Sequence, residues 1–126
     1  MTPVEQRAPH RVVCGYLRLL GVPARKATGL RAALEDYCLQ YGLLLAAVCT
    51  ERVRPVCGQP PIAFTALLDV LALPEVVGVV MPSPAHLGPT PLRAGREQRI
   101  RAAGGEFHFV RGQLRNQAPA VRRPGQ

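Results

Sequence analysis

The apolar run Val76–Met81, V-V-G-V-V-M, constrains the fold most strongly, because it is apolar on both faces of an extended chain and too short for a typical helix. Such a run is typical of a strand buried in the centre of a parallel sheet. The turn that follows, Ser83–Pro89, then lies at the carboxyl end of that strand, where open α/β sheets place their ligands. It holds one serine and one histidine, Ser83 and His86, and no carboxylate, lysine or arginine.

The size and charge of the chain narrow the classes of protein to consider. With 126 residues, 48% of them apolar, the chain is long enough for one packed domain. The formal net charge is +8, and nearly all of the positive charge is arginine, since Lys26 is the only lysine. Arginine enrichment fits phosphate recognition and GC-rich coding equally well. No apolar run reaches the ~20 residues that span a bilayer, and the N-terminus does not resemble a signal peptide, so we expect a cytoplasmic protein without membrane contact.

The order of the remaining elements indicates an α/β fold. Three further strands are expected from short apolar runs at Arg11–Leu20, Leu43–Cys49 and Glu106–Val110. Between the strands, apolar residues recur at helical spacing, and we predict helices after Ala24, after Pro61 and from Thr90, with Thr90 as N-cap. The alternation predicts a single-domain, open, mostly parallel sheet in strand order 2-1-3-4, with helices on both faces in three layers.

The third helix and the ends of the chain supply the candidate surface for nucleic acid. Leu92, Ile100 and Ala103 are the only good core contacts of this helix, so its charged residues are expected to be solvated. Residues 1–10 are expected to form a flexible arm, 11–110 the domain, and 111–126 a basic, disordered tail. The DNA-binding candidates are the arginines of the helix and the tail: Arg93, Arg96, Arg99, Arg111, Arg115, Arg122 and Arg123.

Few residues offer other chemistry. Ser83 as a nucleophile needs a base, and no acid lies near enough in sequence to orient His86, so Ser83 is interpreted as a turn residue. Arg18, at the end of the first strand, could bind a phosphate or form an ion pair with Glu51, which is expected in the loop after the second strand.

The cysteines and histidines do not form a recognised pattern. Cys14, Cys38 and Cys49 fall within predicted elements and are interpreted as buried thiols. Cys49, Cys57, His86 and His108 lack the spacing of metal ligands. Glycine-rich phosphate loops are absent. We therefore expect neither a metal nor a cofactor.

From Arg11 to Val110 the chain resembles the catalytic domain of serine recombinases, the resolvase and invertase group. That family opens with a strand reading Y-x-R-x-S, matched here by Tyr16–Leu20. Its valine-rich strand ends in D-R-L-x-R, matched by Ala85–Pro89, and its closing G-x-x-F strand looks like Gly105–Val110. The resemblance implies a resolvase-like three-layer fold.

The departures from the family pattern fall on the catalytic residues. Leu20 stands at the position of the nucleophilic serine, and Ala85, His86 and Pro89 replace an aspartate and two arginines. Of the arginine cluster that stabilises phosphoryl charge in the family, only Arg18 remains. The resemblance thus implies a vestigial pocket and no catalytic residue; the pocket comprises Tyr16, Arg18, Leu20 and His86.

Three hypotheses for function follow. The first is a catalytically inactive, recombinase-like domain that binds DNA non-specifically or a protein partner, as a homodimer or as a heteromer with a recombinase. The second is a small doubly wound anion-binding or regulatory domain unrelated to DNA, with Arg18 and Ser83–Pro89 holding the anion. The third is an enzyme of another type that uses Cys14 or Ser83.

Overall fold

The structure is a computed structural model that describes residues 11–54 and 61–111. The expected N-terminal arm, Cys57 and the tail beyond Arg111 lie outside these ranges. None of the described helices is both long and apolar enough to span a membrane. The elements in chain order are β1 (Arg11–Arg18), α2 (Ala24–Gln40), β2 (Leu43–Glu51), α3 (Ile62–Leu71), β3 (Val76–Met81), the 3₁₀ helix η1 (Pro84–Leu87), α4 (Thr90–Ala102) and β4 (Glu106–Phe109).

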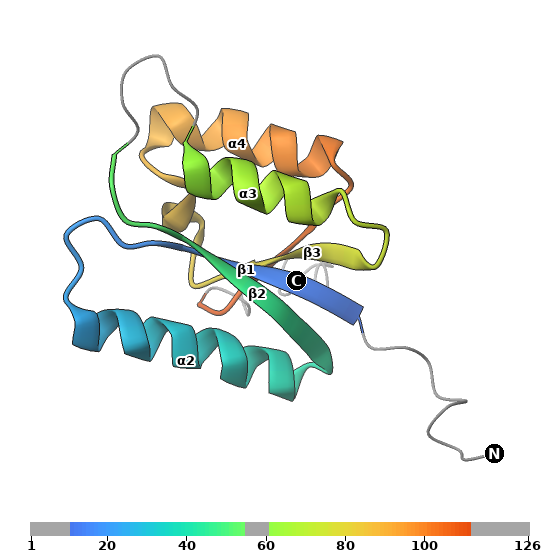
Figure 1. Cartoon of the computed structure of the whole chain (residues 1–126), viewed down its shortest axis with the longest axis horizontal. Coiled ribbons are helices and arrows are strands. Elements are labelled where there is room, and N and C mark those ends of the chain that lie inside the picture. The colour runs from blue at the N-terminus through green and yellow to red at the C-terminus, as the bar shows by residue number, and fades with distance from the viewer. Residues whose placement is uncertain (1–10, 55–60, 112–126) are drawn as a thin grey trace, which may run out of the picture.

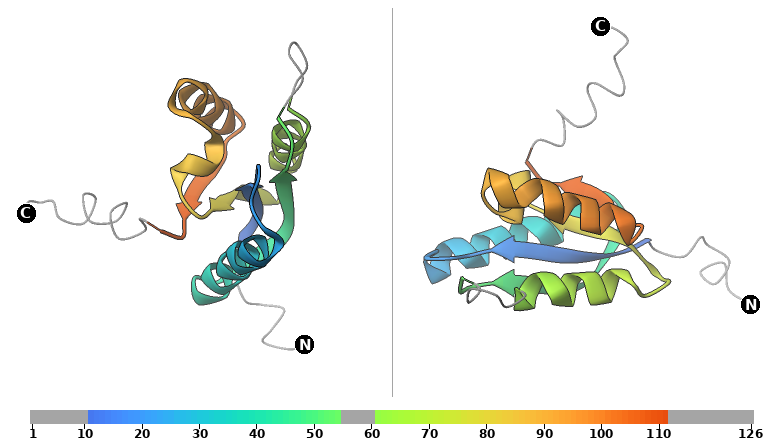
Figure 2. Two further views of the ribbon diagram at one scale, coloured as in Figure 1. Left: turned by 90° about the vertical axis from the view of Figure 1, so that its left-hand side faces the viewer. Right: turned by 90° about the horizontal axis from the view of Figure 1, so that it is seen from above.

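The four strands form one open parallel sheet in the order β2-β1-β3-β4, which confirms the predicted fold class and strand order. Helix α2 covers one face of the sheet, and α3 and α4 lie together on the other (Figure 1). The end-on view in Figure 2 shows these three layers. Because all strands run the same way, their carboxyl ends meet at one edge of the sheet, which we call the carboxyl edge.

The core is divided by the sheet into two apolar clusters, as a three-layer fold requires. On the side of α3 and α4, Tyr16, Phe64, Leu67 and Ile100 are fully buried. On the side of α2, the central residues are Val13, Leu17, Leu34 and Val80. The strand predicted from Val76–Met81 contributes to both clusters, because its residues point alternately to the two faces and neither face is solvated.

Two glycines are required by the backbone itself. Gly42 follows α2 with a φ of +70°, the left-handed conformation predicted for the end of that helix. Gly78 lies where β4 approaches β3 most closely, and a Cβ atom there would stand 2.5 Å from the backbone oxygen of Glu106. A side chain at position 78 would therefore push β4 away from the sheet.

Several element boundaries differ from the prediction. β1 ends at Arg18 instead of Leu20, and β2 continues to Glu51, which was expected in a loop. Helix α4 has Pro89, not Thr90, at its N-cap position and no side-chain cap. Leu92 and Ala103, expected in the core, are both exposed. That helix is anchored by Ile100 and, unexpectedly, by a buried arginine described below.

Replacing Leu67 by aspartate should unfold the domain. Leu67 is fully buried between α3 and the sheet, and a buried unpaired carboxylate costs several kcal/mol against a total stability of roughly 5–15 kcal/mol. The control is Ile62→Asp in the same helix, where the side chain is 85% exposed. Thermal melts followed by circular dichroism should show a cooperative transition for the parent and the control only. A parent-like melt of Leu67→Asp would contradict the packing of α3.

Candidate functional site

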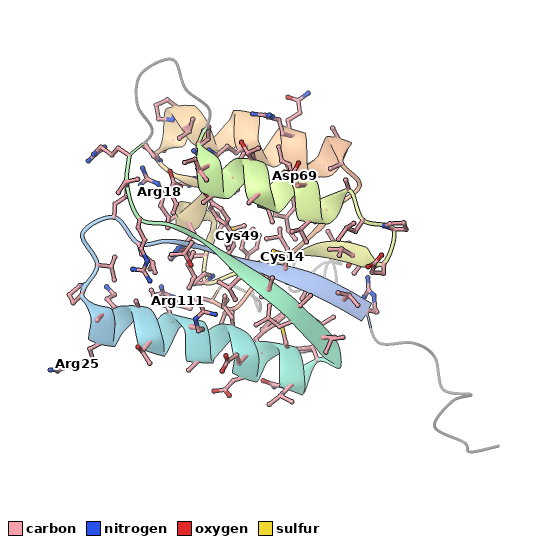
Figure 3. The ribbon with its side chains drawn as sticks, viewed as in Figure 1. Cys14, Arg18, Arg25, Cys49, Asp69 and Arg111 are labelled. Carbon is pink, nitrogen blue, oxygen red and sulfur yellow. The ribbon has the colours of Figure 1, made fainter. Side chains whose placement is uncertain are left out.

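The carboxyl edge brings together ionisable residues from four separate elements. Arg18 is the last residue of β1, and it is paired in register with Glu51, the last residue of β2. His86 lies in η1, which follows β3, and Arg96 projects from the middle of α4. Figure 3 shows Arg18 at this edge.

Glu51 is the centre of a buried hydrogen-bond network. Its Oε1 atom accepts a hydrogen bond from the hydroxyl of Tyr16 at 2.8 Å and another from Nη1 of Arg96 at 3.1 Å. Nε of Arg18 lies 3.5 Å from the same oxygen. The Glu51 and Arg96 side chains are only 3% and 4% exposed. A single carboxylate is therefore shared between two guanidinium groups and one phenol.

The burial of Arg96 corrects the expectation that this residue is solvated and free to contact DNA. Its guanidinium stacks over the ring of Phe64, 4.9 Å from the ring centroid, and also donates to the carbonyl of Leu87 at 3.4 Å. A charge this deeply buried persists only when it is paired and hydrogen-bonded. Arg96 therefore acts as a structural link between α4 and β2 and offers no surface to a phosphate backbone.

The network has consequences for protonation and leaves polar atoms unsatisfied. The pKa of Tyr16 is raised, first by burial and then by its hydrogen bond to Glu51, so the phenol remains protonated and donates. Among the described residues, Nε of Arg18 and Oε2 of Glu51 are buried without a hydrogen bond. Arg18 is thus held near Glu51 by charge and without hydrogen-bond geometry. This agrees with the ion pair that was one of the two interpretations of its position in the sequence.

His86 is neutral and its tautomer is determined by its contact. The backbone N–H of Arg18 donates to Nδ1 of His86 at 2.9 Å, so any proton on the neutral ring is on Nε2. Burial, and after it the positive charges of Arg111, Arg18 and Lys26, lower the pKa of His86 to about 4. His86 therefore adds no positive charge to the site at neutral pH.

The other candidate nucleophiles lack what a nucleophile needs. Ser83 precedes η1, and no hydrogen bond within the described ranges joins its hydroxyl to His86, whose Nδ1 is already occupied. Cys14 is fully buried, and its hydrogen bond with Cys49, followed by burial, raises its pKa, so the thiol stays protonated. Leu20 lies just beyond β1, half-buried, with an apolar side chain.

The thiols and imidazoles are separated in space. Sγ of Cys14 lies 3.6 Å from Sγ of Cys49, and Cys38 is buried on α2. Figure 3 labels Cys14 and Cys49 near each other on the neighbouring strands β1 and β2. His108 contacts Tyr37 instead, with 3.4 Å between Nδ1 and the phenol oxygen. In the part of the chain that the structure describes, no three cysteine, histidine, aspartate or glutamate side chains are placed to hold a metal ion.

The arginines that the sequence proposed for DNA binding differ in how exposed they are. Arg99 and Arg111 are exposed and Arg93 is half-buried, with its guanidinium donating to the carbonyl of Gly88 at 3.2 Å. Lys26 and Arg111 lie close enough to His86 to influence its pKa, so both are at the carboxyl edge. Arg115, Arg122 and Arg123 lie outside the described residues.

Sequence reasoning missed the link between Tyr16, Glu51 and Arg96. One signal for it was present: Arg96 stands four residues before Ile100, the best core residue of α4, so the two side chains share one face of the helix. The partner carboxylate, 45 residues away, could not be identified from that spacing.

Three solved structures share this fold over most of both chains. The C-terminal catalytic domain of ISC1926 TnpA, an IS607-like serine recombinase, has a TM-score of 0.67 at 14% identity, covering 86% of this chain and 74% of that one. The N-terminal catalytic domain of TP901-1 integrase has a TM-score of 0.64 at 12% identity, covering 81% and 78%. A serine recombinase from Sulfolobus solfataricus has a TM-score of 0.54 at 18% identity, covering 90% and 80%.

No family model matches the sequence, and no curated protein sequence matches it. At identities this low, the likeness to solved structures concerns the fold. The chain therefore has the fold of serine recombinase catalytic domains, as its sequence indicated, while the roles of its residues have to be argued from its own site.

Replacing Glu51 by glutamine should destabilise the domain strongly. The substitution preserves shape but leaves the buried Arg96 and the adjacent Arg18 without a counter-charge, and breaking a buried ion pair costs about 3–5 kcal/mol. The matched control is Glu35→Gln, at an exposed position of α2. Urea unfolding at pH 7 should show a large fall in the midpoint for Glu51→Gln and little change for the control. Equal midpoints for the two variants would contradict the proposed role of the network.

Proposed function

We propose that this domain is a serine recombinase-like module that does not cleave DNA and acts by interaction. Its ligand is duplex DNA, bound without sequence preference through exposed basic residues at the carboxyl edge, or a protein partner such as an active recombinase. The observation that carries the proposal is the pairing of Glu51 with Arg18 and Arg96 at the place where the fold positions its ligand site.

The residues at this site support the absence of cleavage. Covalent phosphoryl transfer needs a nucleophile, and the leucine at position 20 has no lone pair to offer. It also needs positive charge directed at the non-bridging oxygens in the transition state. Here Glu51 partly neutralises Arg18 and Arg96, and His86 is uncharged at neutral pH. The internal carboxylate therefore reduces the positive charge that Arg18 and Arg96 could direct at a phosphoryl group, and Arg96 is too deeply buried to reach one.

The distribution of exposed charge supports interaction with DNA. At the carboxyl edge the carboxylate of Glu51 is buried and paired, whereas Glu75 and Glu106 lie beside the amino ends of β3 and β4. Within the described ranges, none of Lys26, Arg93 and Arg111 forms a salt bridge. Such a one-sided field attracts phosphate backbones.

The substitution Leu20→Ser should not restore cleavage. It supplies a hydroxyl, but Arg18 remains paired with Glu51, and no base within the described residues is placed to activate the new serine. Parent and variant are incubated with supercoiled plasmid, beside a competent serine recombinase as positive control. We expect neither nicks nor protein-linked DNA from the two proteins. A covalent DNA adduct formed by the parent would overturn the proposal, and Ser83 would be the first residue to mutate.

If DNA is bound, the affinity should fall steeply with salt, with a log–log slope of about −0.9 for each phosphate neutralised. The double variant Lys26→Gln/Arg111→Gln should reduce that slope by about 1.8 and weaken binding to all sequences alike. The control, Arg11→Gln/Arg101→Gln, removes the same charge from the start of β1 and the end of α4. Electrophoretic shifts between low and moderate salt measure both slopes. No shift for the parent, or equal slopes for both double variants, would exclude DNA binding at the carboxyl edge and leave the protein partner.

A further inference from the structure

A cavity of about 200 Å³ opens on the face of the sheet opposite the Glu51 network. It lies between the first two turns of α2 and the carboxyl ends of β1 and β2. Its wall is apolar at Leu17 and Leu19. It is polar at Thr28, Arg31, Thr50 and Arg52. It shares none of its lining residues with the Tyr16, Glu51 and Arg96 network.

The cavity exists because α2 carries small residues at its start and large ones at its end. Ala24, Ala27 and Thr28 follow one helix face toward the sheet, and none of them is long enough to fill the space above β1 and β2. In the second half of the helix, Leu34 and Tyr37 pack against the sheet. The domain is therefore closed at the amino end of the sheet and hollow at its carboxyl edge, on this face.

The electrostatics of the cavity are opposite to those of the Glu51 site. Thr50 is paired with Leu17 and Glu51 with Arg18, and adjacent strand residues point to opposite faces, so the carboxylate lies across the sheet. No acidic side chain lines the cavity. Within the described ranges, neither Arg31 nor Arg52 forms a salt bridge. Both guanidinium groups are exposed and available to an anion.

We propose that this cavity binds a phosphate ester, a group shared by free nucleotides and by the ends of nucleic acid strands. Arg31 and Arg52 donate charge-assisted hydrogen bonds to the phosphate oxygens, from the two sides of the opening. The hydroxyls of Thr28 and Thr50 supply further donors at its rim. The side chains of Leu17 and Leu19 form the apolar wall against which a sugar or a base packs.

A phosphate is favoured over a carboxylate as the ligand because two guanidinium groups and two hydroxyl groups line the same cavity. A phosphate monoester has enough acceptor oxygens to satisfy donors converging from several directions, and its double charge gains more from two arginines. The first turn of α2, which forms part of the wall, carries no acidic residue that would oppose the anion. The site does not depend on DNA binding at the outer rim, since Lys26 and Arg111 do not line it.

The experiment follows backbone amides by nuclear magnetic resonance while adenosine 5′-monophosphate, adenosine or inorganic phosphate is added to the full-length chain. Adenosine 5′-monophosphate should shift the amides of Thr28, Thr50 and Arg52, whereas adenosine, which lacks the phosphate, should not. Arg52→Gln and Arg31→Gln should each lower the affinity about tenfold, the loss expected for one charge-assisted hydrogen bond. The matched control is Arg25→Gln, because Arg25 lies on α2 outside the cavity lining and points away from the domain in Figure 3.

Two short single-stranded oligonucleotides, with and without a 5′-phosphate, distinguish the sources of the ester. If the 5′-phosphorylated strand binds more tightly than both the unphosphorylated strand and adenosine 5′-monophosphate, the site is assigned to strand ends. If adenosine 5′-monophosphate binds more tightly than the phosphorylated strand, the site is assigned to free nucleotides. The proposal is overturned if none of the phosphate-bearing probes shifts the amides of the cavity at millimolar concentration, if adenosine binds as well as its monophosphate, or if Arg25→Gln weakens binding as much as Arg52→Gln. Unchanged affinity of Arg52→Gln for duplex DNA, beside the weakened binding of Lys26→Gln/Arg111→Gln, separates this site from the DNA-binding rim.

Discussion

The structure of the carboxyl edge depends on one carboxylate oxygen. Oε1 of Glu51 accepts hydrogen bonds from Tyr16 and Arg96 and lies within ion-pair distance of Arg18, so a single atom links β1, β2 and α4. Removing these charges from water is costly, and the cost is offset only while each charge keeps its partners. The position of α4 over the sheet is therefore coupled to the geometry of one residue at the end of an edge strand.

That coupling also determines what the site can offer a ligand. Arginines at the carboxyl ends of parallel strands are well placed to bind phosphate, and in this domain Arg18 and Arg96 instead satisfy an internal carboxylate. The alternation of side chains along β2 confines this neutralisation to one face of the sheet. On the other face, Thr50 and Arg52 border a cavity that no acidic side chain lines. Glu51 thus belongs to a structural ion pair on one face of the sheet, while its neighbour Thr50 belongs to a candidate ligand site on the other face.

The likeness to serine recombinase catalytic domains illustrates how a fold can be shared while the groups at its site differ. The sheet order, the helices and the course of the chain agree with solved structures at 12–18% identity, and such agreement needs only similar burial and connection geometry. Chemistry needs particular atoms at particular distances. A leucine at position 20, a neutral His86 and a carboxylate between two arginines give this site properties of its own.

The fold could be predicted from the sequence because its signals are local. The apolar run Val76–Met81, the helical spacing between the strands and Gly42 each specify an element from neighbouring residues alone. The handedness of parallel connections, together with the buried character of the first and third strands, then indicates the strand order. The burial of Arg96 was decided by the tertiary structure. A helical pattern predicts that an arginine is solvated unless a buried partner for its charge is known. Here the partner is the carboxylate of Glu51, at the end of a strand 45 residues earlier in the chain. The cavity beside α2 is likewise a property of packing, because small residues leave a space only where the sheet beneath them ends.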